Sequence, residues 1–210
     1  NPKPMIEVGG NPIIDRIVDM FDPKDFIIFI CNERHLEETN IRDYLYDLHP
    51  NSYVVDVLEH NEGPVFTTLP YMDMIEDDEP VIVTYCDNPY LWDYKKFKKW
   101  VKENEVDGCI LTHSGFHPHR LASTYMAYCK TKKDGSLIEI KEKEPYTKNH
   151  MKEHASTGTY YFKKGSYIKQ YFQDAIDNEV KHSNGEYYVT LVYNLLVKDK
   201  LDVKVYDTDH

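Results

Sequence analysis

The stretch Val81-Ile-Val-Thr-Tyr-Cys-Asp87 decides the fold that this sequence predicts. It is a short run of β-branched and aromatic residues that ends on a carboxylate, which is typical of a buried central strand. Pro80 precedes it and Asn88-Pro89 follows it, so both ends carry turn-forming residues. In open α/β sheets ligands bind beyond the carboxyl ends of the strands. Asp87 is therefore the first candidate for a metal or phosphate site, with a helix cap or a turn as alternative roles.

Apolar periodicity predicts alternating helices and strands on both sides of this stretch. Before it we expect helices at 12–21, 40–48 and 63–75 and strands at 25–31 and 52–58. After it we expect a helix at 92–105 and a strand at 108–112. This order predicts an α/β fold, with a mainly parallel sheet, right-handed crossovers and helices on both faces.

The pattern changes after residue 121. Strands are expected at 122–130, 137–142 and 157–162 with no long helix between them, which indicates an antiparallel extension folded over the mouth of the sheet. Helices at 166–176 and 187–197 and a strand at 203–206 complete the chain. No linker divides the sequence, so residues 1–210 are expected to form a single domain.

The composition excludes several classes of partner. The formal net charge is −11, which argues against a general nucleic-acid or anionic-membrane surface. No apolar run is long enough to span a bilayer. The four cysteines form no CxxC pair, and they are expected to be buried reduced thiols of a cytoplasmic protein. Both a monomer and a homo-oligomer remain open.

Several motifs follow one another in a specific order. The chain begins Asn1-Pro-Lys-Pro-Met-Ile-Glu-Val-Gly-Gly-Asn-Pro-Ile-Ile-Asp-Arg16. Later come Gly63-Pro64, the strand-end Asp87, Glu142-Lys143 before Pro145, Gly158-Thr-Tyr-Tyr-Phe162 and Gly185-Glu186. Together they resemble the sugar-phosphate nucleotidylyltransferases, or sugar-nucleotide pyrophosphorylases, over essentially the whole chain. The runs 115–119 and 185–189 resemble the capsule and lipopolysaccharide gene-cluster branch of that family.

The resemblance also shows which family features the sequence lacks. The family's first strand and its Gly-rich, Arg-containing nucleotide loop would precede Asn1, and further helices would follow His210. No GxxxxGK[ST] or GxGxxG pattern replaces that loop. We therefore expect both ends of the natural chain to be missing here. The 210-residue form is expected to bind nucleotide poorly, to be catalytically inactive and to expose an aggregation-prone sheet edge.

The resemblance implies a reaction and the residues that perform it. A phosphate monoester attacks the α-phosphorus of a nucleoside triphosphate, which releases pyrophosphate and leaves a nucleotide-diphospho sugar. Lys3 would contact phosphate, Asp87 would hold Mg²⁺, and Lys143 would grip the phosphate of the acceptor. Gly63 would let the backbone approach the base, with a plain helix-start turn as the alternative.

The remaining candidates line the acceptor or bind metal. By resemblance Glu142, Gly158 and Glu186 line the sugar-phosphate pocket, although each alone is typical of a surface charge or a turn. A second metal ligand is expected at the end of the last strand, where Asp207 and Asp209 stand, and we favour Asp209. The histidines of the run 113–119 are expected to line the acceptor pocket, because a zinc site lacks further Cys or His ligands at suitable spacing.

Two other functions compete with nucleotidyl transfer. A nucleotide-sugar glycosyltransferase has a similar sheet, but it needs no pair of phosphate-gripping lysines and more often carries Asp-x-Asp, where this chain has Asp87-Asn88-Pro89. The other alternative is a non-catalytic relative that keeps the fold and has lost the triphosphate loop.

Overall fold

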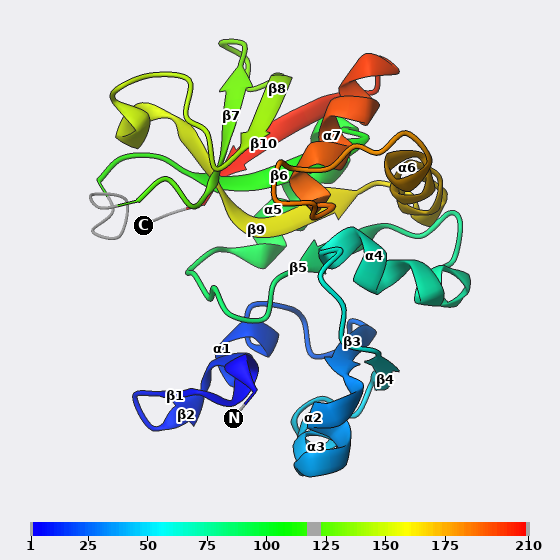
Figure 1. Cartoon of the computed structure of the whole chain (residues 1–210). Helices are drawn as coiled ribbons and strands as arrows, with labels where there is room; N and C mark the ends of the chain where they lie inside the picture. Colours follow the sequence, from blue (N-terminus) through cyan, green and yellow to red (C-terminus); the bar gives the residue numbers. More distant parts are fainter. Residues whose placement is uncertain (1, 117–122, 209–210) are drawn as a thin grey trace. The chain divides into compact units, whose positions relative to one another are not determined.

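The computed structural model describes residues 2–116 and 123–208. They form two compact units, one of Asn1–Asn61 with Tyr85–Tyr94 and one of Glu62–Thr84 with Lys95–His210. Figure 1 draws the helices and strands of both units in the order of the chain. The prediction of a single domain stays a prediction.

The first unit begins with a small hairpin. The 3-10 helix η1 (Lys3–Met5) leads into β1 (Glu7–Val8), which pairs antiparallel with β2 (Asn11–Pro12). Gly9 and Gly10 form the turn with φ of +66° and +91°, which favours glycine. Helix α1 (Ile13–Val18) follows Pro12 directly, so the predicted helix forms over a shorter range than 12–21.

The rest of the first unit is built around two parallel strands. Strands β3 (Ile27–Asn32) and β4 (Ser52–Val57) pair in parallel, and α2 (Glu33–Glu38) and α3 (Ile41–Leu48) connect them. Helix α2 was not predicted, because its apolar pattern is too short to show a period; the Asn32 side chain caps it by accepting from Arg34 N–H. The hydrophobic core of the first unit consists of Ile14, Ile17, Val18, Met20, Ile41, Leu45 and Val54.

A six-stranded mixed sheet forms the centre of the second unit. Its strands are β5 (Val81–Thr84), β6 (Gly108–His113), β7 (Ala127–Thr131), β8 (Leu137–Glu142), β9 (His154–Phe162) and β10 (Val203–Asp207). Strand β10 pairs parallel with β6, whereas β9 runs antiparallel to β5, β6 and β7. The predicted α/β class is therefore confirmed, with a mixed sheet.

Two details of this sheet differ from the prediction. Strand β9 belongs to the main sheet, where it lies between β5 and β6, and not to an extension over the sheet (Figure 1). Among the described residues β5 pairs with β9 alone, so it lies at an edge of this sheet and not at its centre. The apolar pattern of a segment predicts a strand but not which strand lies beside it.

Helices cover both faces of the second unit's sheet. Phe97 of α5 (Tyr94–Asn104) packs against Tyr161, while Tyr193 of α7 (Val189–Lys198) packs against the adjacent Tyr160. Because consecutive residues of a strand point to opposite faces, α5 and α7 lie on opposite sides of β9. The other helices are α4 (Pro64–Thr68), η2 (Leu69–Met74), η4 (His150–Lys152) and α6 (Gly165–Asp177).

Two further expectations can be compared with the described residues. No helix in the described ranges is both long and apolar enough to cross a membrane. All four cysteines are free, and Cys109 and Cys129 are buried as expected. Cys31 is only partly buried and Cys86 is exposed, which corrects the prediction for these two thiols. Cys86 is exposed because β5 ends before it, at Thr84.

Candidate active site

The candidate site residues of the first unit are a lysine and a carboxylate. Lys3 lies in η1, and Asp87 lies in a turn that follows β5 in the chain. Lys3 Nζ is 3.9 Å from Asp87 Oδ2, with 79% and 43% of the two side chains exposed. Because both side chains are exposed, both charges are accessible to a ligand. Such an exposed ion pair contributes little to stability. Asp87 does not begin a helix, because α5 starts only at Tyr94.

In the second unit Lys143 is held by a tyrosine. Lys143 Nζ donates to the Tyr188 hydroxyl at 2.6 Å and lies 4.7 Å from the centroid of the same ring. The hydrogen bond to Tyr188 is the main cause that raises the pKa of Lys143; burial opposes it, and the charges of Glu142 and Glu186 reinforce it. The lysine therefore stays cationic at neutral pH, as a phosphate-binding group must.

The backbone also fixes Lys143. Its φ is +60°, which is uncommon for a residue with a side chain and costs free energy, on the order of 1–3 kcal/mol. The Lys143 N–H donates to the Met126 carbonyl at 3.0 Å, so the residue remains tied to the chain just before β7. Glu105, Glu179 and Lys200 also have positive φ, so this backbone alone does not identify Lys143 as functional.

Glu142 is the last residue of β8 and is buried. Thr190 Oγ1, on α7, donates to Glu142 Oε2 at 2.8 Å. Burial raises the pKa of Glu142, and the hydrogen bond from Thr190 and the charge of Lys143 partly offset that rise. A buried carboxylate that keeps an unshared oxygen can accept a hydroxyl hydrogen bond from a sugar.

The loop of residues 182–188 brings Glu186 and Gly63 to the same region. The Tyr187 N–H donates to Glu62 O at 2.8 Å, and the Val65 N–H donates to Tyr187 O at 3.1 Å. A Cβ on Gly63 would lie 3.0 Å from Tyr187 N and 3.1 Å from Glu186 Cβ. The close approach of this loop, together with a φ of +87°, explains the glycine without a nucleotide.

Gly158 lies at an irregularity within β9. The β6–β9 register shifts between Ile110 and Thr112, and Gly158 has φ of +86°. Its N–H donates to Ser156 Oγ at 3.1 Å, outside the ladder of the sheet. A glycine with left-handed backbone is common at such a bulge, so the fold alone also explains this residue.

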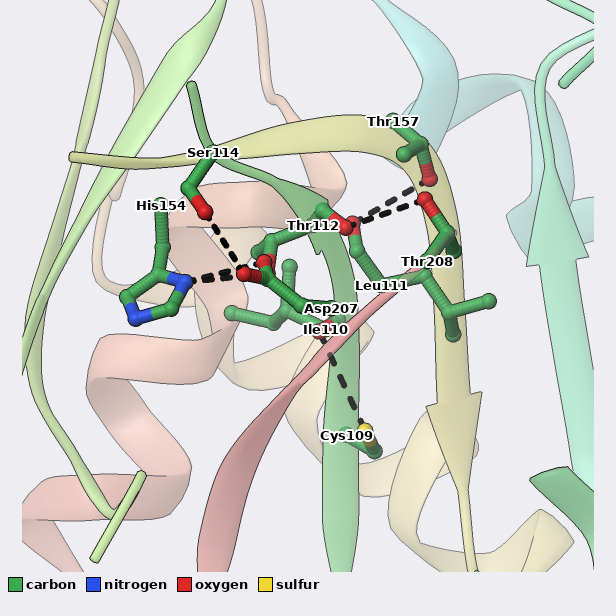
Figure 2. A network of polar contacts seen from close by, with 9 residues as sticks. All are labelled: Cys109, Ile110, Leu111, Thr112, Ser114, His154, Thr157, Asp207 and Thr208. Carbon is green, nitrogen blue, oxygen red and sulfur yellow. Dashed lines mark hydrogen bonds and ion pairs between the residues drawn. The ribbon is translucent and has the colours of Figure 1, made fainter. Parts of the chain in front are cut away.

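Asp207 is the centre of a polar network at the ends of β6 and β10 (Figure 2). It accepts hydrogen bonds from Thr112 and Ser114 at 2.7 Å each, and His154 Nδ1 lies 3.0 Å from Asp207 Oδ1. Burial favours a higher pKa of Asp207, but these hydrogen bonds outweigh it and lower that pKa. The carboxylate is thus kept ionised at the carboxyl end of two parallel strands.

Most side chains that contact the candidate site residues were not predicted from the sequence. Tyr188, Thr190, His154 and Ser114 contact candidate residues or Asp207, and none of them was given a role. Their contacts join elements far apart in the chain, which periodicity does not reveal. The only signal for Tyr188 in the sequence is its place in the run 185–189, two residues after Glu186.

The described residues offer Mg²⁺ few protein ligands. In the described ranges no group of three or more His, Cys, Asp and Glu side chains could hold a metal ion by itself. Mg²⁺ is usually held by one or two carboxylates together with substrate phosphates and water. The half-exposed Asp87 beside Lys3 fits that mode, in which the substrate completes the site. Asp209, His117 and His119 lie outside the described residues.

A family model for nucleotidyl transferases matches residues 1–205. Because the match extends over nearly the whole sequence, the chain belongs to the nucleotidyl transferase family. No curated protein matches the chain by sequence at a significant level.

Solved structures share the fold at low identity. A nucleoside-diphosphate-sugar pyrophosphorylase from Vibrio cholerae RC9 is 18% identical with a TM-score of 0.73, over 99% of this chain and 84% of that one. HddC from Yersinia pseudotuberculosis is 21% identical with a TM-score of 0.63, over 99% and 81%. A CMP:2-keto-3-deoxy-manno-octonic acid synthetase complexed with CTP is 12% identical with a TM-score of 0.65, over 98% and 83%. At these identities the similarity establishes the fold alone.

Proposed function

We propose that this protein transfers a nucleotidyl group from a nucleoside triphosphate to a sugar 1-phosphate or a similar small phosphomonoester. The observation that carries the proposal is the family match over residues 1–205. The grouping of Lys143, Glu142 and Glu186 in the second unit supports it, because a cation and carboxylates suit a phosphorylated sugar. The names of the Vibrio cholerae and CTP-bound neighbours describe the same kind of chemistry.

The reaction needs no dedicated base. A phosphomonoester has a second pKa near 6, so it is largely dianionic at neutral pH. One of its oxygens forms a bond to the α-phosphorus, the bond from that phosphorus to the oxygen bridging to the β-phosphate breaks, and pyrophosphate leaves with that electron pair. The protein must align two anions and reduce their repulsion.

Each candidate residue has a proposed part in that task. Lys3 neutralises charge on the triphosphate, and the Lys143 ammonium holds the acceptor phosphate. Glu142 and Glu186 accept hydrogen bonds from sugar hydroxyls. Gly63, directly before α4, would border the nucleotide, and Gly158, at the irregularity within β9, would border the acceptor. Asp209 stays the proposed second metal ligand.

Asp87 would hold Mg²⁺, which when bound screens the triphosphate charge and stabilises the charge that develops on the leaving pyrophosphate. The setting that we propose is cytoplasmic synthesis of a nucleotide sugar for a surface polysaccharide such as capsule or lipopolysaccharide. The proposed partners are the two small substrates, with no nucleic acid and no membrane.

A pyrophosphate-release screen tests the proposal. It uses the natural chain, with any residues that precede Asn1 or follow His210, and Mg²⁺. The five common nucleoside triphosphates are each tested against sugar 1-phosphates, phosphocholine and related monoesters. We expect release that needs both substrates for at least one pair. Release of a nucleoside diphosphate from nucleotide sugars, without any triphosphate, would favour the glycosyltransferase instead.

A further inference from the structure

We propose that Tyr188 both holds Lys143 in place and is itself a phosphate-binding residue, so that the two side chains form a two-donor subsite for the acceptor phosphomonoester. This inference rests on the proposed function and adds a residue to it. The subsite lies where β8 ends and α7 begins, and all of its residues belong to the second unit.

Tyr188 restrains the lysine through two contacts at once. Its hydroxyl accepts from Lys143 Nζ at 2.6 Å, and the centroid of its ring lies 4.7 Å from the same nitrogen. A lysine side chain has many rotamers, and fixing it when substrate binds costs conformational entropy. A tyrosine that holds the ammonium beforehand removes much of that cost.

Tyr188 is itself fixed by the loop of residues 182–188. Asn184 Nδ2 donates to the Tyr188 hydroxyl at 3.1 Å, and the His182 ring meets the Tyr188 ring edge to face at 5.9 Å. Asn184 Oδ1 accepts from the Glu186 N–H at 3.1 Å, so the amide nitrogen must be the atom that faces Tyr188. The orientation of the tyrosine therefore follows from the loop.

The hydrogen bonds that Tyr188 accepts determine where its own O–H proton can be donated. Neither the Lys143 ammonium nor the Asn184 NH₂ group can accept a hydrogen bond, so both donate to the Tyr188 oxygen. The Tyr188 O–H proton must then be directed to a third group. A phosphate oxygen placed beside the lysine is an acceptor of the required kind. The subsite would thus offer an ammonium and a phenol proton to one phosphate.

The pKa of Lys143 also depends on its contact with Tyr188. The hydrogen bond from Lys143 to Tyr188 is the largest cause that raises the pKa of the lysine. Replacing the hydroxyl by hydrogen removes that stabilisation of the ammonium. In a Tyr188→Phe variant the pKa of Lys143 should therefore fall, and more of the amine should be neutral and nucleophilic at a given pH.

The test compares Tyr188→Phe with the matched control Tyr187→Phe in the natural chain. The Tyr187 ring lies 5.8 Å from Lys181 Nζ, so the control removes the hydroxyl of a neighbouring tyrosine whose ring contacts a different lysine. The first readout is the rate at which acetic anhydride acetylates Lys143 at pH 8, measured by peptide mass spectrometry. The second readout is KM for the acceptor and for the triphosphate.

We expect Tyr188→Phe to accelerate acetylation of Lys143 several-fold and to raise KM for the acceptor about tenfold, the loss expected for a charge-assisted hydrogen bond. KM for the triphosphate should stay within twofold, and Tyr187→Phe should change neither readout. Unchanged acetylation of Lys143 in Tyr188→Phe would overturn the inference, as would faster acetylation with an unchanged KM for the acceptor.

The same experiments give a different result if the protein does not catalyse nucleotidyl transfer. If the wild-type protein turned over no pair of substrates, nucleotidyl transfer would be contradicted. Acetylation of Lys143 and binding of inorganic phosphate, measured by calorimetry on wild type and Tyr188→Phe, would then decide the inference alone. Faster acetylation with weaker phosphate binding would support the subsite, and either effect without the other would contradict it.

Discussion

Lys3 Nζ lies 3.9 Å from a carboxylate oxygen of Asp87, although the two residues are far apart in the sequence. Asp87→Asn should abolish Mg²⁺-dependent turnover, with a loss on the order of a thousandfold, because it removes the proposed anchor of the metal. The fold should persist, since an exposed ion pair contributes little to stability. Steady-state rates across a Mg²⁺ titration, together with circular dichroism, measure both effects. The control is Asp19→Asn, an exposed carboxylate of the same unit. Near-normal turnover of Asp87→Asn would refute the metal assignment.

Lys143→Ala should weaken use of the acceptor far more than use of the triphosphate. A cation that holds one phosphate acts mainly on the substrate that carries it, so we expect KM for the acceptor to rise about tenfold to a hundredfold. KM for the triphosphate should change by less than about threefold. Lys133→Ala, on an exposed turn of the same unit, serves as the control. Equal rises in both KM values would remove Lys143 from the acceptor site.

Glu142→Gln should stabilise the protein at neutral pH. Burial raises the pKa of Glu142 above 4.5, so its ionisation opposes folding. The free-energy cost of ionising Glu142 is absent at pH values below the pKa of this residue in the unfolded chain. It is complete at pH values above its pKa in the folded protein. Glutamine keeps an oxygen for the hydrogen bond from Thr190 and carries no charge. The free energy of unfolding in urea should be higher for the variant at pH 7, and the gap should close as the pH falls towards 4. A gap that does not depend on pH would contradict this explanation.

Gly63→Ala should destabilise the second unit more than Gly185→Ala does. The two glycines have similar φ values, +87° and +92°, but a Cβ on Gly63 would lie 3.0 Å from Tyr187 N, whereas nothing lies within 4 Å of one on Gly185. The control therefore carries the backbone strain alone, about 1–3 kcal/mol. The difference between their unfolding free energies measures the close approach of the loop of residues 182–188. Equal losses in the two variants would show that this approach is loose.

The sequence predicted the elements of the fold better than their pairing. Strand β8 forms at 137–142 as predicted, and α6 extends the predicted range 166–176 by one residue at each end. The insertion of β9 between β5 and β6 was not predicted, because alternation along a strand does not identify its neighbours. Pro70 lies at the start of η2, so the predicted helix 63–75 divides there into α4 and a 3-10 helix.

In the candidate site, too, individual residues were predicted better than the side chains that contact them. Motif order identified Lys143 and Glu142, and the structure adds that Tyr188 and Thr190 hold them. The contacts of Asp207 with Ser114 and His154 were not predictable, because they need the register of three strands. Gly63 and Gly158 were singled out for function, yet local backbone geometry explains both. Their roles towards substrate stay predictions.

The most direct test of the central claim is the stoichiometry of the products. Phosphorus NMR follows the natural chain with Mg²⁺, the triphosphate and the phosphomonoester that the screen identifies. Nucleotidyl transfer predicts one pyrophosphate for each nucleotide-diphospho product, with two coupled diphosphate resonances and no nucleoside monophosphate. Pyrophosphate formed together with nucleoside monophosphate, and no coupled diphosphate product, would mean that water is the acceptor and would contradict the account.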